Sequence, residues 1–345
     1  MNDHTIVQGL DPILKYYGIQ ANFVEKYGKI YKIYSNKGTF ALKQIPIHHG
    51  IDFIKHVQYL FQKGFNRIVP IYPSLDGRYA ILYENTLYYL MPWLINDEKE
   101  DRDKRPQLMF RELARMHSLS QKELVVNKEE RTEHYEKTKQ QWEKDIELME
   151  GFIETCEKKM YMSPFELQFC LYFHEIRLAQ RYALTRFEEW YEATKDNEKA
   201  RSVINHGKVS TEHFLFDEKG YGYFSNFEDS GLGSPIHDVL PVLYRSLKGQ
   251  LRKFDEALTW LYDGYFKYFP LKEEEKLLFY SYVSYPNPII RITKEYLQAN
   301  EKRNELKFSQ KLLKRYWQLK NTEYIVMRMT EIEKQLKQKK EGAPE

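Results

Sequence analysis

Residues 21–95 alternate between short β-favouring runs and turns, with a single helical pattern among them. Gly28 and a turn at residues 36–38 separate the first three runs, and apolar side chains recur at helical spacing over residues 51–62 before Gly64. The runs are residues 23–26, 30–34, 39–45, 80–83 and 87–91. We therefore predict a twisted antiparallel sheet of five strands, with one helix between the third and the fourth strand.

Helical periodicity dominates the rest of the 345-residue chain. A charged linker at 96–106 leads to a helix at 107–119, and a helical hairpin insertion is expected at about 120–200. The hairpin breaks at Ser163 and Pro164, where Ser would cap the next helix and Pro would occupy its first position. A non-helical segment follows at 203–238. Helices resume from 239 to about 339, broken near Pro270 and at 286–288, and a frayed tail ends the chain.

The order of these elements predicts an α+β fold with two lobes of the protein kinase-like type. The N-lobe, residues 1–94, would hold the small antiparallel β-sheet. The larger, mostly helical C-lobe, residues 95–345, would contain the hairpin insertion and the segment at 203–238.

Charge and hydropathy exclude several classes of function. Lys and Arg total 53 against 50 for Asp and Glu, and this interleaved balance of +3 does not indicate a nucleic-acid surface. The most hydrophobic stretch, 81–95, is too short and too polar to span a bilayer, so no membrane insertion is expected. Residues 1–11 lack the apolar region of a secretory signal, which predicts synthesis in the cytoplasm. Cys156 and Cys170 show no metal-ligand spacing, so we expect buried thiols and no metal site.

Aromatic residues are frequent, with 28 Tyr and 20 Phe spread along the chain. Packing in the core and at the lobe interface explains them, because a buried Tyr ring can leave its hydroxyl in water. Cross-linking through exposed tyrosines in an insoluble assembly is the alternative.

Two motifs point to nucleotide chemistry. In the third predicted strand, Ala41 and Lys43 share one face, which combines a small residue that admits a flat base with an ammonium group for phosphate. Residues 204–216 and 223–228 resemble the catalytic loop and the metal loop of the aminoglycoside phosphotransferase and choline kinase group. That group has a His-Gly-Asp motif, an Asn five residues after the Asp, and later an Asp at a strand end. His206 and Gly207 match this pattern.

The reactive positions differ from those of the group. Lys208 stands where the resemblance implies the catalytic Asp, and a protonated ammonium group neither accepts a proton nor tolerates magnesium nearby. His213 replaces the metal-binding Asn, although magnesium prefers oxygen ligands, and Asn226 replaces the magnesium-binding Asp. Each loss typically costs several kcal/mol of transition-state stabilisation, so the three together predict a negligible rate of phosphate transfer.

Three further residues near these positions have expected roles. Glu228 allows two interpretations, a cation ligand or an ion-pair partner of Lys208, and we expect the ion pair. Asp238 matches the structural Asp of the group, which implies that it braces the catalytic loop. His206 is likewise expected to be structural.

Nucleotide binding itself is predicted to be weak. Its residues, vestigial in this interpretation, are Lys43, Ala41, Met91 and Glu228. The first strand turn has only Gly28, where a glycine-rich loop would present several backbone N–H groups to phosphates. The helix at 51–62 has no Glu to pair with Lys43, although Asp52 lies near its start. We therefore expect no cofactor, neither ATP nor magnesium.

Longer stretches are similar to the CotS group of spore coat proteins from endospore-forming bacteria, in particular its YsxE and YutH branch. These stretches are residues 38–43, 88–94, 112–117, 161–170 and 206–208, which span nearly the whole chain. The resemblance implies a kinase-like fold, synthesis in the mother cell and assembly into the spore coat, with other coat proteins as partners.

Three functions stay open at this point. The leading hypothesis is a catalytically inactive, kinase-like coat component, a pseudokinase, that acts as a structural or protein-binding part. The alternative is an active small-molecule phosphotransferase that uses ATP and magnesium with Glu228 and Lys43. A third possibility is a module that binds a nucleotide or metabolite without turnover.

Overall fold

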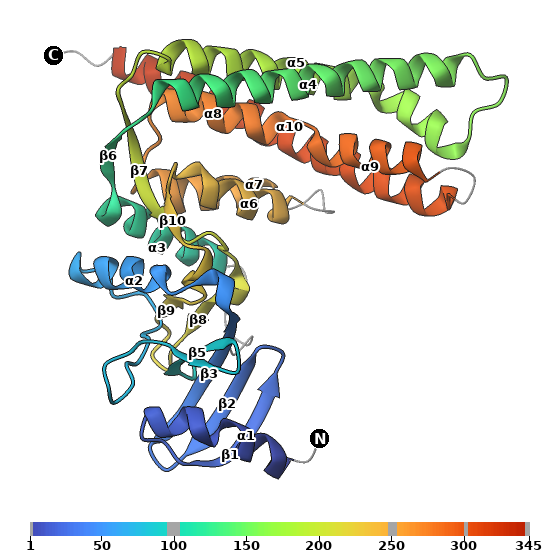
Figure 1. Ribbon diagram of the computed structural model, residues 1–345. Coiled ribbons are helices and arrows are strands. Elements are labelled where there is room, and N and C mark those ends of the chain that lie inside the picture. Colours follow the sequence, from blue (N-terminus) through green and yellow to red (C-terminus); the bar gives the residue numbers. More distant parts are fainter. Residues whose placement is uncertain (1–2, 95–103, 248–253, 300–302, 342–345) are drawn as a thin grey trace. The chain divides into compact units, whose positions relative to one another are not determined.

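The computed structural model describes residues 3–94, 104–247, 254–299 and 303–341, which form two compact units (Figure 1). The first unit lies within residues 1–121 and 203–238, and the second within 122–202 and 239–345. Residues 95–103, which include most of the predicted linker, lie outside the described residues. The lobe boundary that we predicted after residue 94 therefore stays a prediction.

A five-stranded antiparallel sheet forms the core of the first unit, in the order β1-β2-β3-β5-β4. All five predicted strands are confirmed to within two residues at either end, because alternation and turn residues set both their position and their limits. The strands are β1 (Ala21–Tyr27), β2 (Ile30–Ser35), β3 (Gly38–Pro46), β4 (Ile81–Tyr83) and β5 (Thr86–Pro92). In this register Ala41 is opposite Met91, and Lys43 is opposite Tyr89.

One face of the sheet is covered by α1 (Asp3–Tyr16), a helix that we did not predict (Figure 1). Leu10, Ile13 and Leu14 of this helix are buried against Ile33, Leu42 and other residues of the sheet. Apolar residues at 10, 13, 14 and 17 repeat at helical spacing, so a signal was present, although Gly9 and Pro12 interrupt the pattern. The side chains of Ala41 and Lys43 lie on the other face, because side chains alternate along a strand.

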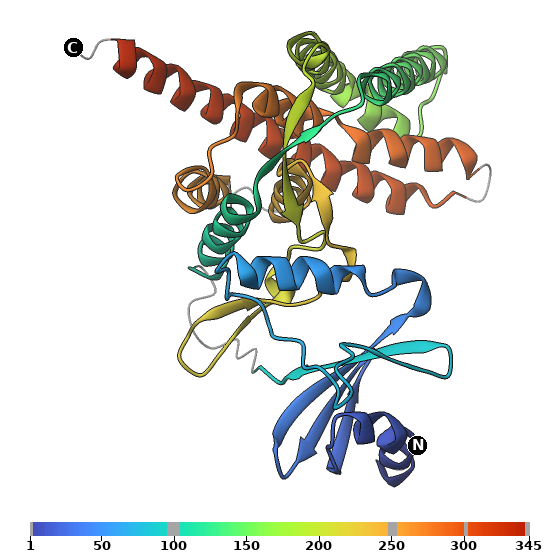
Figure 2. The same ribbon diagram turned by 60° about the vertical axis from the view of Figure 1, so that its left-hand side comes forward.

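Two helices and several short elements complete the first unit. The predicted helices correspond to α2 (Asp52–Gln62) and α3 (Lys104–Ser120). α2 packs against α3 and against the short helix η3 (Phe227–Asp229) (Figure 2). The segment at 203–238 contains further short elements: η2 (Thr211–His213), β8 (Phe214–Phe216), β9 (Gly222–Phe224) and β10 (Gly231–Gly233). β8 and β9 form a hairpin, and β10 pairs with residues 203–205 of β7 (Lys199–Asn205).

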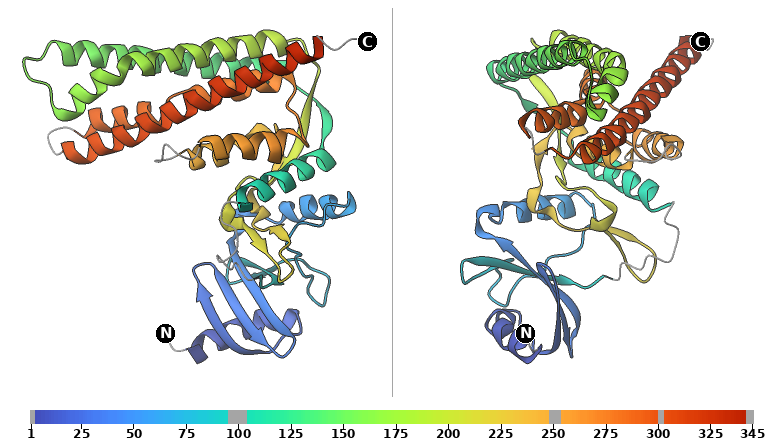
Figure 3. Two further views of the ribbon diagram at one scale, coloured as in Figure 1. Left: turned by 180° about the vertical axis from the view of Figure 1, so that it is seen from behind. Right: turned by 90° about the vertical axis from the view of Figure 1, so that its right-hand side faces the viewer.

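The second unit is built on the predicted helical hairpin, α4 (Lys128–Glu157) and α5 (Pro164–Thr194), which lie side by side in Figure 3. Ser163 caps α5 with a reciprocal capping box to Glu166, and Pro164 occupies the first turn, so this predicted break is confirmed. A short strand, β6 (Lys122–Val125), was not predicted and pairs with the first residues of β7.

Helices follow to the end of the described chain, with the breaks that Pro270 and residues 286–288 predicted. They are α6 (Ile236–Ser246), α7 (Phe254–Thr259), the π-helix η4 (Trp260–Phe266), α8 (Glu273–Ser284), α9 (Asn287–Gln298) and α10 (Glu305–Glu341). A core rich in aromatic residues joins α4, α5, α9 and α10, and it contains Phe165, Phe169, Phe187 and Tyr296. The predicted frayed tail at 342–345 lies outside the described residues. None of the described helices combines the length and the apolar content needed to cross a bilayer.

Candidate functional site

Asp238 anchors the backbone of the loop that corresponds to the predicted catalytic loop. Its Oδ2 accepts the backbone N–H of His206 at 2.6 Å, and its Oδ1 accepts that of Gly207 at 2.9 Å. The Nε2 atom of His117, on α3, lies 3.2 Å from Oδ2. Burial opposes ionisation of Asp238, but its hydrogen bonds with His117 and the His206 backbone hold its pKa below the ordinary value. The carboxylate therefore fixes two consecutive peptides of the loop.

His206 holds the loop against the segment before η3. Its Nε2–H donates to the Ser225 carbonyl at 2.7 Å, while its Nδ1 accepts the backbone N–H of Lys208 at 3.2 Å. This pattern requires the neutral ring, and complete burial of His206 lowers its pKa accordingly. Gly207 has a φ of +83°, and a Cβ atom there would lie 2.2 Å from the carbonyl oxygen of Asp229.

Lys208 points to a different partner from the one we predicted. Its ammonium group forms an ion pair with Asp229, and 56% of its side chain is exposed. Nδ1 of His49 lies 3.6 Å from the other oxygen of Asp229. Burial opposes ionisation of Asp229, but Lys208 and His49 lower its pKa. The expected ion pair between Lys208 and Glu228 is wrong, because Glu228 turns inward to another cation.

That cation is Lys43, which lies at the centre of a buried polar cluster. Lys43 Nζ forms an ion pair with Glu228 and donates to Asn226 Oδ1 at 2.5 Å. The hydroxyl of Tyr89, opposite Lys43 on β5, donates to Glu228 Oε1 at 2.6 Å. Only 11% of the Lys43 side chain and 6% of the Glu228 side chain are exposed. We call these four residues the Lys43 cluster.

Burial and ion pairing act in opposite directions on the pKa values of Lys43 and Glu228. Burial lowers the pKa of Lys43, only partly offset by the charge of Glu228. Burial opposes ionisation of Glu228 too, yet the charge of Lys43 and hydrogen bonds from Lys43 and Tyr89 lower its pKa. Burial and the nearby carboxylate raise the pKa of Tyr89 well above its usual value, so its hydroxyl stays a donor. Asn226 adopts left-handed backbone with φ +68°, a conformation that Asn tolerates well.

The remaining predicted site residues lie close by. His213 closes the loop, because its Nδ1–H donates to the Lys208 carbonyl at 2.8 Å. Ala41 and Met91 are buried neighbours on adjacent strands, on the same face as Lys43. The structure therefore brings together the residues assigned from sequence to the catalytic loop and to the nucleotide site.

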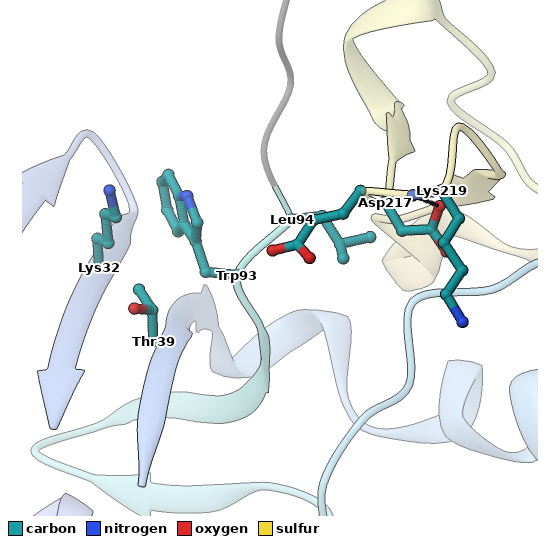
Figure 4. Close-up of a pocket in the computed structure, with 7 residues that line it drawn as sticks. Lys32, Thr39, Trp93, Leu94, Asp217 and Lys219 are labelled. Atoms are coloured by element: carbon teal, nitrogen blue, oxygen red, sulfur yellow. Dashed lines mark hydrogen bonds between the residues drawn. The ribbon is translucent and has the colours of Figure 1, made fainter. Parts of the chain in front are cut away.

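A cavity of about 550 Å³ lies near the end of β5, beside Trp93 and Leu94. Figure 4 shows Lys32, Thr39 and Trp93 on one side of it and Asp217 and Lys219 on the other. Its described lining residues include no member of the Lys43 cluster.

Three contributors to the site were missed from sequence. Tyr89 precedes Met91 by two residues on the same strand face, so alternation alone could have indicated it. Asp229 follows Glu228 directly, so the sequence placed a second carboxylate beside the one that we assigned to Lys208. His117 carries no such signal, because its place beside Asp238 depends on how α3 packs.

The comparisons with known proteins agree with this geometry at the level of the fold. An aminoglycoside phosphotransferase from Alicyclobacillus acidocaldarius subsp. acidocaldarius DSM 446 is 14% identical with a TM-score of 0.69, and the alignment covers 92% of this chain and 94% of that one. The spectinomycin phosphotransferase APH(9)-Ia, in complex with ADP and spectinomycin, is 13% identical with a TM-score of 0.53, covering 94% of this chain and 99% of that one. These two likenesses confirm the predicted kinase-like fold.

Choline kinase LicA from Streptococcus pneumoniae is also similar, at 13% identity and a TM-score of 0.47, with 93% of this chain and 99% of that one covered. A search of curated proteins found no match. The protein-family model described as "Spore coat putative kinase YutH" matches residues 11–329. This match spans most of the chain and confirms the predicted relationship, so the chain belongs to the YutH family of spore coat proteins.

Proposed function

We propose that this protein is a component of the spore coat that uses a kinase-like fold for binding or structure and does not transfer phosphate. One observation carries the proposal. The ammonium group of Lys43, which a phosphotransferase would offer to a nucleotide phosphate, is neutralised inside the chain by Glu228 and hydrogen-bonded to Asn226. A phosphate would have to displace a buried carboxylate to reach it, at the cost of leaving that charge unpaired.

The residues around the Lys43 cluster do not fit magnesium and ATP. Lys208 places a cation at the position of a proton acceptor, and its charge is already compensated by Asp229. The amide oxygen of Asn226 accepts from Lys43, so a metal ion would compete with an ammonium group for it. Within the described residues, no group of three or more His, Cys, Asp or Glu side chains is arranged to hold a metal ion. We therefore derive no phosphate-transfer step.

Membership of the YutH family supports a place in the spore coat. In this proposal the chain is made in the mother cell and assembles with other coat proteins, and neither nucleic acid nor membrane insertion is part of its role. The near balance of charges in the sequence does not favour nucleic acid as a partner, because nucleic-acid binding requires clustered positive charge.

Transfer of labelled γ-phosphate from ATP tests the proposal. The wild-type chain and a Glu228→Gln variant are incubated with magnesium ATP and pools of sugars and amino-alcohols. We expect the same background in both proteins and in a blank without protein. Transfer by the wild type that the variant lacks would establish the alternative, an active small-molecule phosphotransferase that depends on Glu228.

A second experiment separates a structural role from a nucleotide-dependent one. The double variant Lys43→Met, Glu228→Gln removes both charges of the buried pair, which avoids leaving one of them unpaired. We expect this variant to reach the spore coat in the same amount as the wild type, measured by immunoblot of coat extracts. A folded variant that fails to reach the coat would contradict the proposal.

A further inference from the structure

The two cysteines of the chain lie on the two helices of the α4–α5 hairpin. Cys156, on α4, is fully buried, and Cys170, on α5, is half-buried. Both belong to the packing of the aromatic core of the second unit, Cys156 as a core member and Cys170 as a neighbour packed against it. Both are thiols in this structure.

The register of the hairpin places them at the same level. Toward the turn, Lys159 Nζ lies 2.6 Å from Glu166 Oε1. Farther from the turn, Arg177 Nη2 lies 2.7 Å from Glu150 Oε1. In an antiparallel pair of helices, the residues between two such cross-contacts are matched in order, and Cys156 and Cys170 fall opposite each other between them. Each cysteine is among the groups that shift the pKa of the other, in agreement with this register.

We propose that Cys156 and Cys170 are a redox-active pair that forms a reversible intrachain disulfide and staples α4 to α5 beside their turn. This inference does not depend on the proposed function, because it concerns a different unit of the molecule. The bridge would close a short segment of chain, which restricts the unfolded state and stabilises the hairpin. That segment carries Met160 and Tyr161, two residues that are 88% and 83% exposed.

With hydrogen peroxide as oxidant, the chemistry balances in two steps. The Cys170 thiolate attacks one peroxide oxygen, the O–O bond breaks, and the departing hydroxide takes up a proton to leave as water, which gives a sulfenic acid at Cys170. Cys156 then gives up its proton, its thiolate attacks the sulfur of Cys170, the S–O bond breaks, and the departing hydroxide takes up a proton to leave as the second water. Two thiols are oxidised and one peroxide is reduced.

The order of the two steps follows from exposure and acidity. Cys170 is the more accessible thiol, and the hydrogen bond from Cys156 partly offsets the effect of burial, which raises its pKa. Burial raises the pKa of Cys156 to about 12, so this thiol is protonated at neutral pH and is not the first to react with peroxide. Because only the thiolate of Cys170 reacts, the initial rate should rise about tenfold per pH unit near neutrality.

Titration of free thiols in the full-length chain tests the proposal. After treatment with hydrogen peroxide, we expect both thiols to disappear together, the intact mass to fall by two hydrogen atoms, and a reductant to restore both. Peptide mapping should locate the bridge between Cys156 and Cys170 of one chain. Survival of both thiols, oxidation of one alone, or a bridge between two chains would overturn the proposal.

Two variants assign the steps. In Cys170→Ser, the buried Cys156 should keep its thiol under the same treatment. In Cys156→Ala, Cys170 should stop at the sulfenic acid, which a dimedone adduct detects. If Cys156→Ala does not fold, the wild type and Cys170→Ser still decide the question. Oxidation of Cys156 in Cys170→Ser would contradict the assigned order, and a reaction rate independent of pH would contradict attack by a thiolate.

Discussion

Two features of the loop at 205–208 match the aminoglycoside phosphotransferase pattern to different extents. The first is its backbone frame, meaning the residues that hold the loop backbone in place, and the second is the set of charged side chains that the loop presents. The frame keeps the residues that the aminoglycoside phosphotransferase resemblance implies: Asp238 accepts two consecutive backbone N–H groups, His206 bridges to Ser225, and Gly207 passes close to Asp229. The presented charges are altered, with Lys208 in an ion pair to Asp229 and Asn226 bonded to Lys43. The contacts of Asp238 and His206 that hold the backbone of this loop therefore do not involve the side chains of Lys208 and Asn226.

The two regions also differ in how their charges are balanced. Asp238 is buried and satisfied by donors from three groups, so its charge contributes to the fold. Lys208 is more than half exposed and its pairing with Asp229 is accessible to solvent, so its charge contributes little to stability. Substitutions in the frame should therefore lower the free energy of unfolding far more than a substitution of the exposed Lys208.

The largest effect is expected from Asp238→Ala. The substitution leaves two backbone N–H groups and His117 without their buried acceptor, and removing one partner from such a network costs about 3–5 kcal/mol. Urea denaturation of both proteins measures the free energy of unfolding. A loss below about 1 kcal/mol would show that the frame does not depend on this carboxylate.

Gly207→Ala is expected to destabilise the chain by about 2–4 kcal/mol, because it adds a steric clash to a strained backbone conformation. Gly220→Ala is a matched control. Gly220 has a φ of +76°, close to the +83° of Gly207, but a Cβ there meets nothing within 4 Å. The control should cost only about 1 kcal/mol. Equal losses in the two variants would mean that the contact with Asp229 plays no part.

Glu228→Gln is expected to cost about 2 kcal/mol, because Lys43 keeps its charge in a buried site without its carboxylate partner. The Lys43→Met and double variants complete a thermodynamic cycle. We expect the double variant to be less destabilised than the sum of the single ones. Simple additivity would show that the two charges do not interact.

His206 should make stability depend on pH in mildly acidic solution. Burial lowers its pKa in the folded chain, so below about pH 6.5 the unfolded chain binds a proton that the folded chain does not. The free energy of unfolding should therefore fall as pH falls through this range, by up to about 1.4 kcal/mol per pH unit. His237, whose pKa burial also lowers, adds to the slope, and a His237→Gln variant isolates the part that belongs to His206. A flat profile between pH 6.5 and 5 would contradict a neutral, buried His206.

The smallest effect is expected from Lys208→Ala. Its exposed ion pair with Asp229 should contribute less than about 1 kcal/mol, and added salt should reduce this further. Urea denaturation at low and high salt measures both quantities. A loss of unfolding free energy as large as that of Asp238→Ala would show that the charge of Lys208 stabilises the fold as much as the frame does.

Local patterns predicted much of this fold. Alternation gave the five strands, the Ser163 and Pro164 pair gave the start of α5, and the proline positions gave the breaks between the later helices. These features are local, since the turn or cap residue lies within a few positions of the structure that it determines. α1 was missed because Gly9 and Pro12 weaken its periodicity, although its residues Ile13 and Leu14 are buried against the sheet.

The site was predictable in its residues and less so in its pairings. The motif gave the positions of Lys43, Lys208 and Asn226, but it assigned Glu228 to the wrong cation. Glu228 and Asp229 are adjacent in sequence, and only the turn of η3 decides which carboxylate points to the sheet and which to the loop. Pairing between distant segments depends on tertiary packing, which no local pattern contains.

Thermal unfolding with and without magnesium ATP tests the central claim most directly, because a ligand that binds the folded state must raise its melting temperature. The claim is that the charge of Lys43 is satisfied within the chain and is unavailable to a nucleotide. We predict the same melting temperature with and without saturating magnesium ATP, for the wild type and for the Lys43→Met, Glu228→Gln variant. A rise of several degrees in the wild type that the variant lacks would contradict it.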